Sequence, residues 1–265
     1  TGAYLVIHLL YADLMLRTPG EHRFVGYARM YLGRVPFWLS IAMTVVEMVF
    51  VLTIYLVLSV SFAHLIAPGS EVVKLLVFWG LGSLAIFFSL RRLALSEFLV
   101  TAAIIAIIGA IFFLGAQNIG NLSELRLFTG MPNIFLPFGP VLFALSGRVA
   151  IPSLVAYFRA KGINHDRTLL RRAIVAGTVI PAVVYGLFVL GVLGLSPVPS
   201  EDAVSGLRGL VSAPFLGVIG ILGLLSLWSS YIVVGLDVGN ILRYDLKFSR
   251  LTRIAFVVGG PLILY

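Results

Sequence analysis

The chain has 265 residues, of which 60% are hydrophobic and 11% are charged, and its mean hydropathy is +1.08. A soluble domain carries about 25% charged residues and cannot bury so large an apolar fraction. The composition therefore excludes a disordered, fibrous or soluble globular protein and indicates a multi-pass membrane protein. Disulfides and thiolate metal sites are also excluded, because the chain has no cysteine.

Apolar runs separated by charged or Pro/Gly-rich stretches predict eight helical segments. Their approximate bounds are 2–16, 36–66, 72–90, 94–115, 134–158, 168–195, 211–242 and 251–265. A spanning helix needs about 20 residues, so the first and last runs are short for a span. The chain starts with Thr1 and stops within an apolar run. We therefore expect residues 1–265 to form a single transmembrane domain that is a fragment of a longer protein.

The basic residues are distributed unevenly between the loops. Alternating helices would place 15 of the 19 Lys and Arg residues on one side, and only Lys74, Arg126 and Arg208 on the other. Cytoplasmic loops are enriched in Lys and Arg, so the larger set marks the cytoplasmic side. This distribution explains the net charge of +8 without a nucleic-acid partner. The larger set comprises Arg17, Arg23, Arg29, Arg34, Arg91, Arg92, Arg159, Lys161, Arg167, Arg171, Arg172, Arg243, Lys247, Arg250 and Arg253.

Segment 134–158 contains an unusual number of helix-breaking residues, namely Pro137, Gly139, Pro140, Gly147 and Pro152. Proline removes a backbone donor and clashes with the preceding turn. Gly147 and Pro152 bracket the middle of the span, where freed backbone groups need partners from protein, water or a ligand. Secondary transporters build binding sites in this way. The pattern predicts either a broken helix that binds a ligand or a simple proline kink.

Four stretches resemble one family. FGPVLFALSGRVAIPSL is similar to the sixth helix of the amino acid/auxin permease group, near the bacterial tryptophan and tyrosine permeases. RRAIVAGTVIPAVVYGLFVLGVLGLSPVPSEDAVSGL resembles their seventh helix and the following external loop. LLSLWSSYIVVGLDVGNILRYDLK resembles their eighth helix, and LMLRTPGEHRFVGYARMYLG resembles the loop after their second. The resemblance implies an all-α LeuT-like fold of two inverted repeats, of which this chain would hold the second to ninth helices.

The resemblance implies a secondary active transporter in the plasma membrane, as in a prokaryotic inner membrane. It would carry an amino acid, aromatic or otherwise apolar, by alternating access coupled to H⁺ or Na⁺, without a cofactor. Phe143, Ala144, Ser146, Gly147 and Arg148 would form half of the substrate site, although Arg148 departs from the family's pattern. An intramembrane lipid- or glycan-modifying enzyme, a channel or a receptor are the alternatives. We expect no enzyme, because acids, histidines and cysteines do not cluster along the sequence.

Arg148 and Glu47 are charged residues predicted to lie inside the membrane. Each is about 14–17 Å from the cytoplasmic end of its segment at 1.5 Å per residue. A cation at this depth normally faces a partner or a wet cavity. The two residues could therefore form a gate or a structural pair, or Arg148 could bind a substrate carboxylate.

Several uncharged polar residues and one acid are further candidates. The resemblance implies that Tyr55 binds the substrate carboxylate. The alternative is that Tyr55 is a packed tyrosine without a role in binding. Ser226, Ser229 and Ser230 could provide oxygen ligands for Na⁺ or form hydrogen bonds between helices. Asp237 could relay protons, bind a cation or cap its helix. Two histidines within or near spans, His8 and His64, lack ligand spacing, so we expect no metal site.

The uneven loop charge predicts a topology that labelling can test. Cysteines introduced as Lys161→Cys and Asn121→Cys should react with an impermeant thiol reagent from opposite sides of the membrane. The cysteine-free parent chain provides the unlabelled control. Reaction of both variants from the same side would contradict the alternation.

Overall fold

A computed structural model describes residues 1–18, 20, 22, 24–87, 93–117, 135, 138–162, 166–196, 200 and 202–265. Within these residues every named element is a helix. Four stretches are long and apolar enough to cross a membrane: Arg34–Ile66, Phe98–Ala116, Arg167–Leu195 and Ala213–Asp245. The protein is therefore an all-helical membrane protein. Arg23, Arg91, Arg92, Asn121, Arg126 and Pro137, named above, lie outside the described residues.

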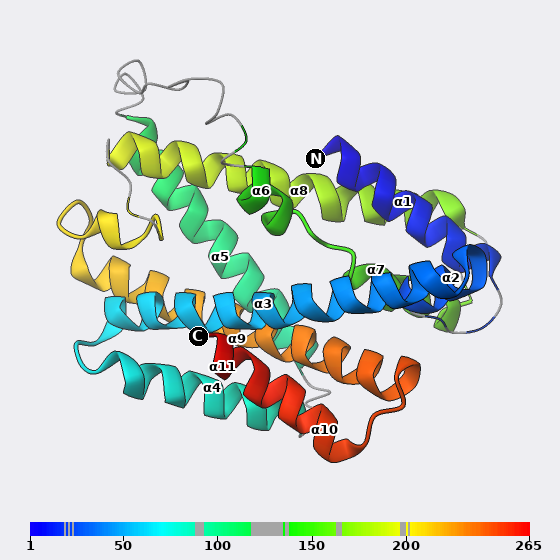
Figure 1. Cartoon of the computed structure of the whole chain (residues 1–265). Coiled ribbons are helices and arrows are strands. Elements are labelled where there is room, and N and C mark those ends of the chain that lie inside the picture. Colours follow the sequence, from blue (N-terminus) through cyan, green and yellow to red (C-terminus); the bar gives the residue numbers. More distant parts are fainter. Residues whose placement is uncertain are drawn as a thin grey trace. The chain divides into compact units, whose positions relative to one another are not determined.

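The helices follow the predicted segments closely (Figure 1). Segments 2–16, 36–66 and 168–195 are α1, α3 and α8, and segment 211–242 is α9 with η4. Segment 251–265 is divided into α10, η5 and α11. The bounds are α1 Gly2–Arg17, α2 Phe24–Leu32, α3 Arg34–Ile66, α4 Glu71–Phe87, α5 Leu93–Ala116, α6 Phe138–Ala144, α7 Ala150–Ala160, α8 Arg167–Leu195, η3 Ser205–Leu207, α9 Ala213–Asn240, η4 Ile241–Asp245, α10 Arg250–Ile254, η5 Ala255–Gly259 and α11 Gly260–Leu264.

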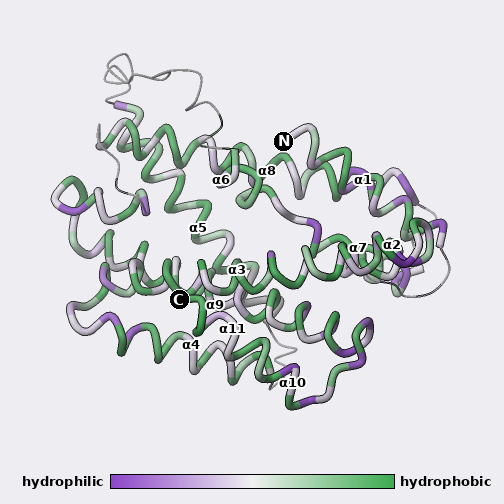
Figure 2. The backbone as a smooth tube through the Cα atoms, viewed as in Figure 1, coloured by the Kyte–Doolittle hydropathy of each residue, from purple (hydrophilic) through white to green (hydrophobic). Residues whose placement is uncertain are grey.

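Helix α2 was not among the predicted segments. Its nine residues lie in a loop that we assign to the cytoplasmic side, and Val25, Tyr27 and Ala28 are buried. Figure 2 shows hydrophobic residues along the long helices and hydrophilic ones around α2 and before α10. Nine residues rise only about 14 Å, which is too short to span. The predicted alternation of sides is therefore unchanged.

The chain packs as two compact units, described here separately. The first unit comprises Thr1–His22 and Phe112–Pro197, and the second comprises Arg23–Ile111 and Val198–Tyr265. In the first, α1, α7 and α8 contact one another; in the second, α3 packs along α9 and also contacts α2, α4 and α11. The expectation of one transmembrane domain remains a prediction.

The helices of the first unit pack through stripes of buried residues at helical spacing. The stripes are His8, Tyr11, Ala12 and Met15 on α1, Ile151, Val155 and Phe158 on α7, and Leu170, Ile174 and Thr178 on α8. Residues spaced by three or four lie on one helix face, so each stripe covers its neighbour. At one end, Arg159 Nη2 donates to the carbonyl of Met15 at 2.5 Å. This bond joins α7 to α1.

The second unit is built on the antiparallel pair α3 and α9. A side chain at Gly223 would overlap the ring of Phe62, and one at Gly220 would meet Ile66. Small residues of this kind let helix backbones approach closely. Trp79 Nε1 of α4 donates to the carbonyl of Val258 in η5 at 2.9 Å. That bond holds the C-terminal helices against α4.

The turn before α9 is fixed by one carboxylate. Asp202 Oδ1 accepts hydrogen bonds from Ser200 Oγ, Val204 N, Ser205 N and Ser205 Oγ at 2.6–3.3 Å. Partial burial opposes ionisation of Asp202, but these four donors outweigh it and hold the pKa of the carboxyl below its usual value. The carboxylate thereby orders the turn that carries η3.

In the first unit, the ends of α5 and α8 cross at glycines. A side chain at Gly194 would overlap the carbonyl of Gly115, whereas Gly186 on the same helix has open space around it. Gly194→Ala should therefore destabilise the protein by about 1–3 kcal/mol, the usual cost of overpacking. The matched change Gly186→Ala should be neutral or stabilising by up to about 1 kcal/mol, because alanine favours helix. Thermal unfolding in detergent measures both, and equal stability of the two variants would contradict this crossing.

Candidate functional site

Segment 134–158 is broken in the structure. Helix α6 ends at Ala144, α7 begins at Ala150, and residues 145–149 are not helical. Ser146 N donates to Phe143 O at 3.2 Å and Gly147 N to Leu145 O at 2.9 Å, in place of helical bonds four residues back. The predicted discontinuity is confirmed, and the simple kink is excluded. We call residues 145–149 the break.

Pro152 explains where the break ends. Its ring would clash with the carbonyl of Arg148 in a continuous helix, since that carbonyl lies four residues earlier. In the first turn of α7, by contrast, the missing N–H has no intrahelical acceptor to lose. Ala150 and Ile151 instead donate to Gly147 O and Arg148 O, at 3.0 and 3.3 Å. A new helix therefore starts at Ala150.

His8 of α1 lies against the break. A side chain built at Gly147 would come within 3.3 Å of His8 Cε1 and 3.7 Å of His8 Nε2. His8 is only 3% exposed, and its ring centroid is 5.6 Å from that of Tyr4. The ring edge that carries Nε2 therefore faces the non-helical backbone.

Hydrogen bonding favours one tautomer of His8. Thr178 Oγ1 donates to Ile174 O at 2.8 Å and lies 3.0 Å from His8 Nδ1. In this arrangement Nδ1 carries the ring proton and donates to Thr178 Oγ1. A neutral imidazole that donates from Nδ1 carries its lone pair on Nε2. This buried Nε2 has no hydrogen-bond partner within the described part of the chain. The break is thus faced by one buried acceptor.

His8 and Thr178 lie at a similar depth. His8 is nine residues before Arg17, at the basic end of α1, and Thr178 is eleven residues after Arg167, at the basic end of α8. At 1.5 Å per residue these separations are about 14 and 17 Å along the two helices. Arg148 was placed at the same depth from the sequence. In a bilayer with a core about 30 Å thick, the predicted spans would place the break and His8 close to the midplane.

The predicted substrate residues of this segment come together at the break. Ser146 and Gly147 are exposed, Phe143 and Ala144 are exposed at the end of α6, and Arg148 is half-buried. An exposed stretch beside a buried acceptor can receive a small ligand. Within the described residues, no group of three His, Cys, Asp or Glu side chains could hold a metal ion.

The remaining predicted site residues belong to the second unit. Tyr55 is half-buried on α3, and Ser226, Ser229, Ser230 and Asp237 are half-buried on α9. Gly223 of α9 lies against Phe62 of α3, and the two helices are antiparallel. Ser230 is seven residues after Gly223 and Tyr55 is seven residues before Phe62, so these two residues lie at the same level. Their roles as substrate and ion ligands remain predictions.

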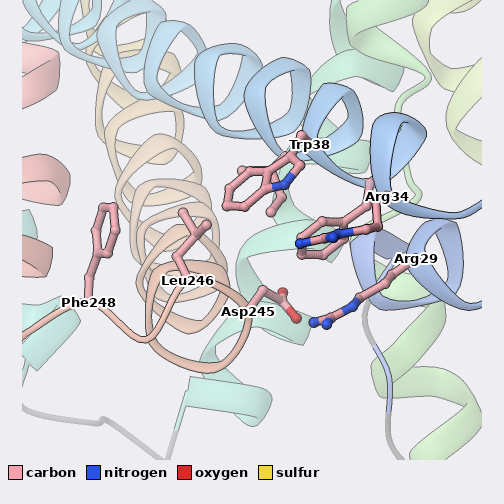
Figure 3. A pocket seen from close by; sticks show the side chains of 8 residues that line it. Arg29, Arg34, Trp38, Asp245, Leu246 and Phe248 are labelled. Carbon is pink, nitrogen blue, oxygen red and sulfur yellow. The ribbon is translucent and has the colours of Figure 1, made fainter.

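The second unit also has a charged pocket of about 470 Å³. Figure 3 shows the Asp245 carboxylate pointing toward Arg29, with Arg34 beside it and Trp38 above. The pocket lies at the ends of α3 and of the α9–η4 helix that loop charge assigns to the cytoplasmic side. It is lined by Arg29, Arg34, Phe37, Trp38, Ile41, Asp245, Leu246 and Phe248. We take the break as the candidate site, because it combines non-helical backbone with the buried His8 Nε2 described above.

The sequence prediction missed His8 as a site residue. The spacing of His8, Tyr11, Ala12 and Met15 could have placed the histidine on the packed face of its helix. Its contacts with Gly147 and Thr178 span more than 130 residues of sequence and carry no local pattern.

Comparison with family models, with curated proteins and with solved structures found no match to this chain. The resemblance to the amino acid/auxin permease group and the LeuT-like repeat therefore remain predictions.

The hypothesis of a Glu47–Arg148 pair needs a direct test, because Glu47 belongs to the second unit and Arg148 to the first. If they pair, Glu47→Gln should leave the Arg148 cation unneutralised at its predicted depth in the membrane, at a cost of about 3 kcal/mol. The double variant with Arg148→Gln should recover part of that loss. Thermal stability in detergent for the singles and the double measures the coupling. Strictly additive effects would reject the pair.

Proposed function

We propose that this protein is a secondary active transporter that carries an amino acid across the membrane by alternating access, coupled to H⁺ or Na⁺. The observation that supports the proposal is the break between α6 and α7, with Arg148 inside it. Interrupted helices at the midplane are typical of transporter binding sites. No step of this function breaks or forms a covalent bond in the solute.

The break offers complementary groups for a zwitterion. The N-terminus of α7 and the guanidinium of Arg148 are positive, and a helix N-terminus favours a carboxylate. The carbonyls at the end of α6 and in the break are acceptors for an ammonium group. Exposed Phe143, with 38% of its surface accessible, offers an apolar contact for the solute's side chain.

An uptake assay tests the proposal. The full-length protein in liposomes should accumulate a radiolabelled apolar or aromatic amino acid under an imposed H⁺ or Na⁺ gradient. A lipid- or glycan-modifying enzyme would alter its substrate chemically, and a channel would not concentrate the solute against its gradient. Equilibration without accumulation, or no uptake from a panel of the twenty amino acids, would reject transport.

Arg148→Gln should lower the catalytic efficiency of uptake by about 10–100-fold, because a charge-assisted hydrogen bond contributes roughly 1.5–3 kcal/mol. Arg172→Gln removes the same charge at the basic end of α8 and should leave uptake within about twofold. Equal effects of the two substitutions would mean that Arg148 acts only through the overall charge of the protein and not by binding the solute.

A further inference from the structure

We propose that His8 Nε2 is the proton-binding atom of the break, and that a ligand carboxylate seated there stabilises the protonated ring. The inference rests on the proposed function and deepens it, since it names H⁺ as the coupling ion and a carboxylate as the group that recruits it. It is carried by three observations: the burial of His8, its hydrogen bond with Thr178 and its contact with Gly147.

The geometry leaves Nε2 as the acceptor at this face of the ring. Nδ1–H is engaged by Thr178, whose own proton is held by Ile174 O. A proton that binds the Nε2 lone pair forms a new N–H bond and leaves the Nδ1–H donation to Thr178 intact. Both ring nitrogens are donors in the imidazolium. The new Nε2–H can then donate to an acceptor in the break.

Burial of His8 disfavours a proton in the empty site, because an ionised ring would lose its hydration. Arg148 follows Gly147 in the sequence and adds a positive charge to the break. The acids on the packed elements are Asp13 and Asp166, near the basic ends of α1 and α8. Asp13 Oδ2 is 2.7 Å from Arg17 Nε, and Asp166 accepts from Leu169 N at 2.8 Å. The other titratable groups on these elements are Tyr4, Tyr11, Arg17, Tyr157, Arg159, Arg167, Arg171, Arg172 and Tyr185.

A bound carboxylate reverses this balance. It supplies a negative charge to both Arg148 and the imidazolium, so the proton and the carboxylate bind more tightly together than apart. By linkage, each raises the affinity of the other by the same factor. Release of the amino acid removes the negative charge and releases the proton. Symport of one proton with one zwitterion moves one net positive charge.

The first readout is the pH dependence of amino-acid binding to the full-length protein. L-tryptophan and L-leucine serve as probes, because the sequence predicts an aromatic or apolar substrate. Wild type should bind up to tenfold more tightly for each unit that the pH falls. His8→Asn keeps an amide near the position of Nδ1 for Thr178 but lacks Nε2, so its affinity should be nearly independent of pH. The matched variant His64→Asn, in α3 of the other unit, should retain the wild-type slope.

The second readout does not depend on transport or on a variant that folds. Nitrogen NMR of the wild-type protein labelled at its four histidines should show a neutral Nδ1–H ring at His8. Saturating L-tryptophan or L-leucine should shift its titration toward higher pH, and the corresponding decarboxylated amines should not.

Each outcome bears on one of the two proposals. A wild-type pH slope in His8→Asn, a His8 titration unmoved by the amino acids, or Na⁺-driven uptake unaffected by His8→Asn would overturn the role of His8 and leave transport standing. A His8 titration that responds to the carboxylates, with no uptake of any amino acid, would support the proton site and reject transport.

Discussion

The hydrocarbon core of a membrane contains no water to satisfy backbone groups, and this constraint shapes the first unit. Pro152 prevents the helix from continuing through Arg148, so α7 starts anew at Ala150 and the preceding residues form short-range bonds. Gly147 has no side chain, which lets α1 bring His8 against the break. The interrupted helix and the buried histidine are thus parts of one arrangement.

The support around this arrangement is apolar and well packed. Stripes on α1, α7 and α8 contact one another, and the polar residues His8 and Thr178 extend two of these stripes to the level of the break. Because the imidazole is held by one defined bond and covered by its neighbours, its orientation needs no ligand. Ser146 and Gly147 remain exposed beside it.

Features encoded by local pattern were predictable, and those made by distant contacts were not. Long apolar runs with charged borders gave the bounds of α3 and α8 within about two residues, and Gly147 with Pro152 located the break. Seven of the nine residues of α2 are hydrophobic, but the run is too short to be separated from a loop by its pattern. The π-helical turns η4 and η5 lie in segments read as regular helix, and the bond from Trp79 to Val258 in η5 joins residues 179 apart in sequence. His8 was missed for the same reason, since Thr178 is 170 residues away.

Arg148, which departs from the pattern of the family that the sequence resembles, has a physical account in this arrangement. If His8 is the proton site, the positive charge of Arg148 in the break would oppose protonation of the ring before a ligand arrives, because like charges repel in a medium that screens them poorly. Under the proposed coupling, a variant without Arg148 would protonate His8 more readily before the ligand arrives. The negative charge that favours the protonated ring would then be that of the ligand carboxylate. If Glu47 pairs with Arg148, it would neutralise the cation before a ligand binds and weaken the coupling between proton and carboxylate. A Glu47–Arg148 pair and a carboxylate site at Arg148 therefore predict opposite charge states for the empty site.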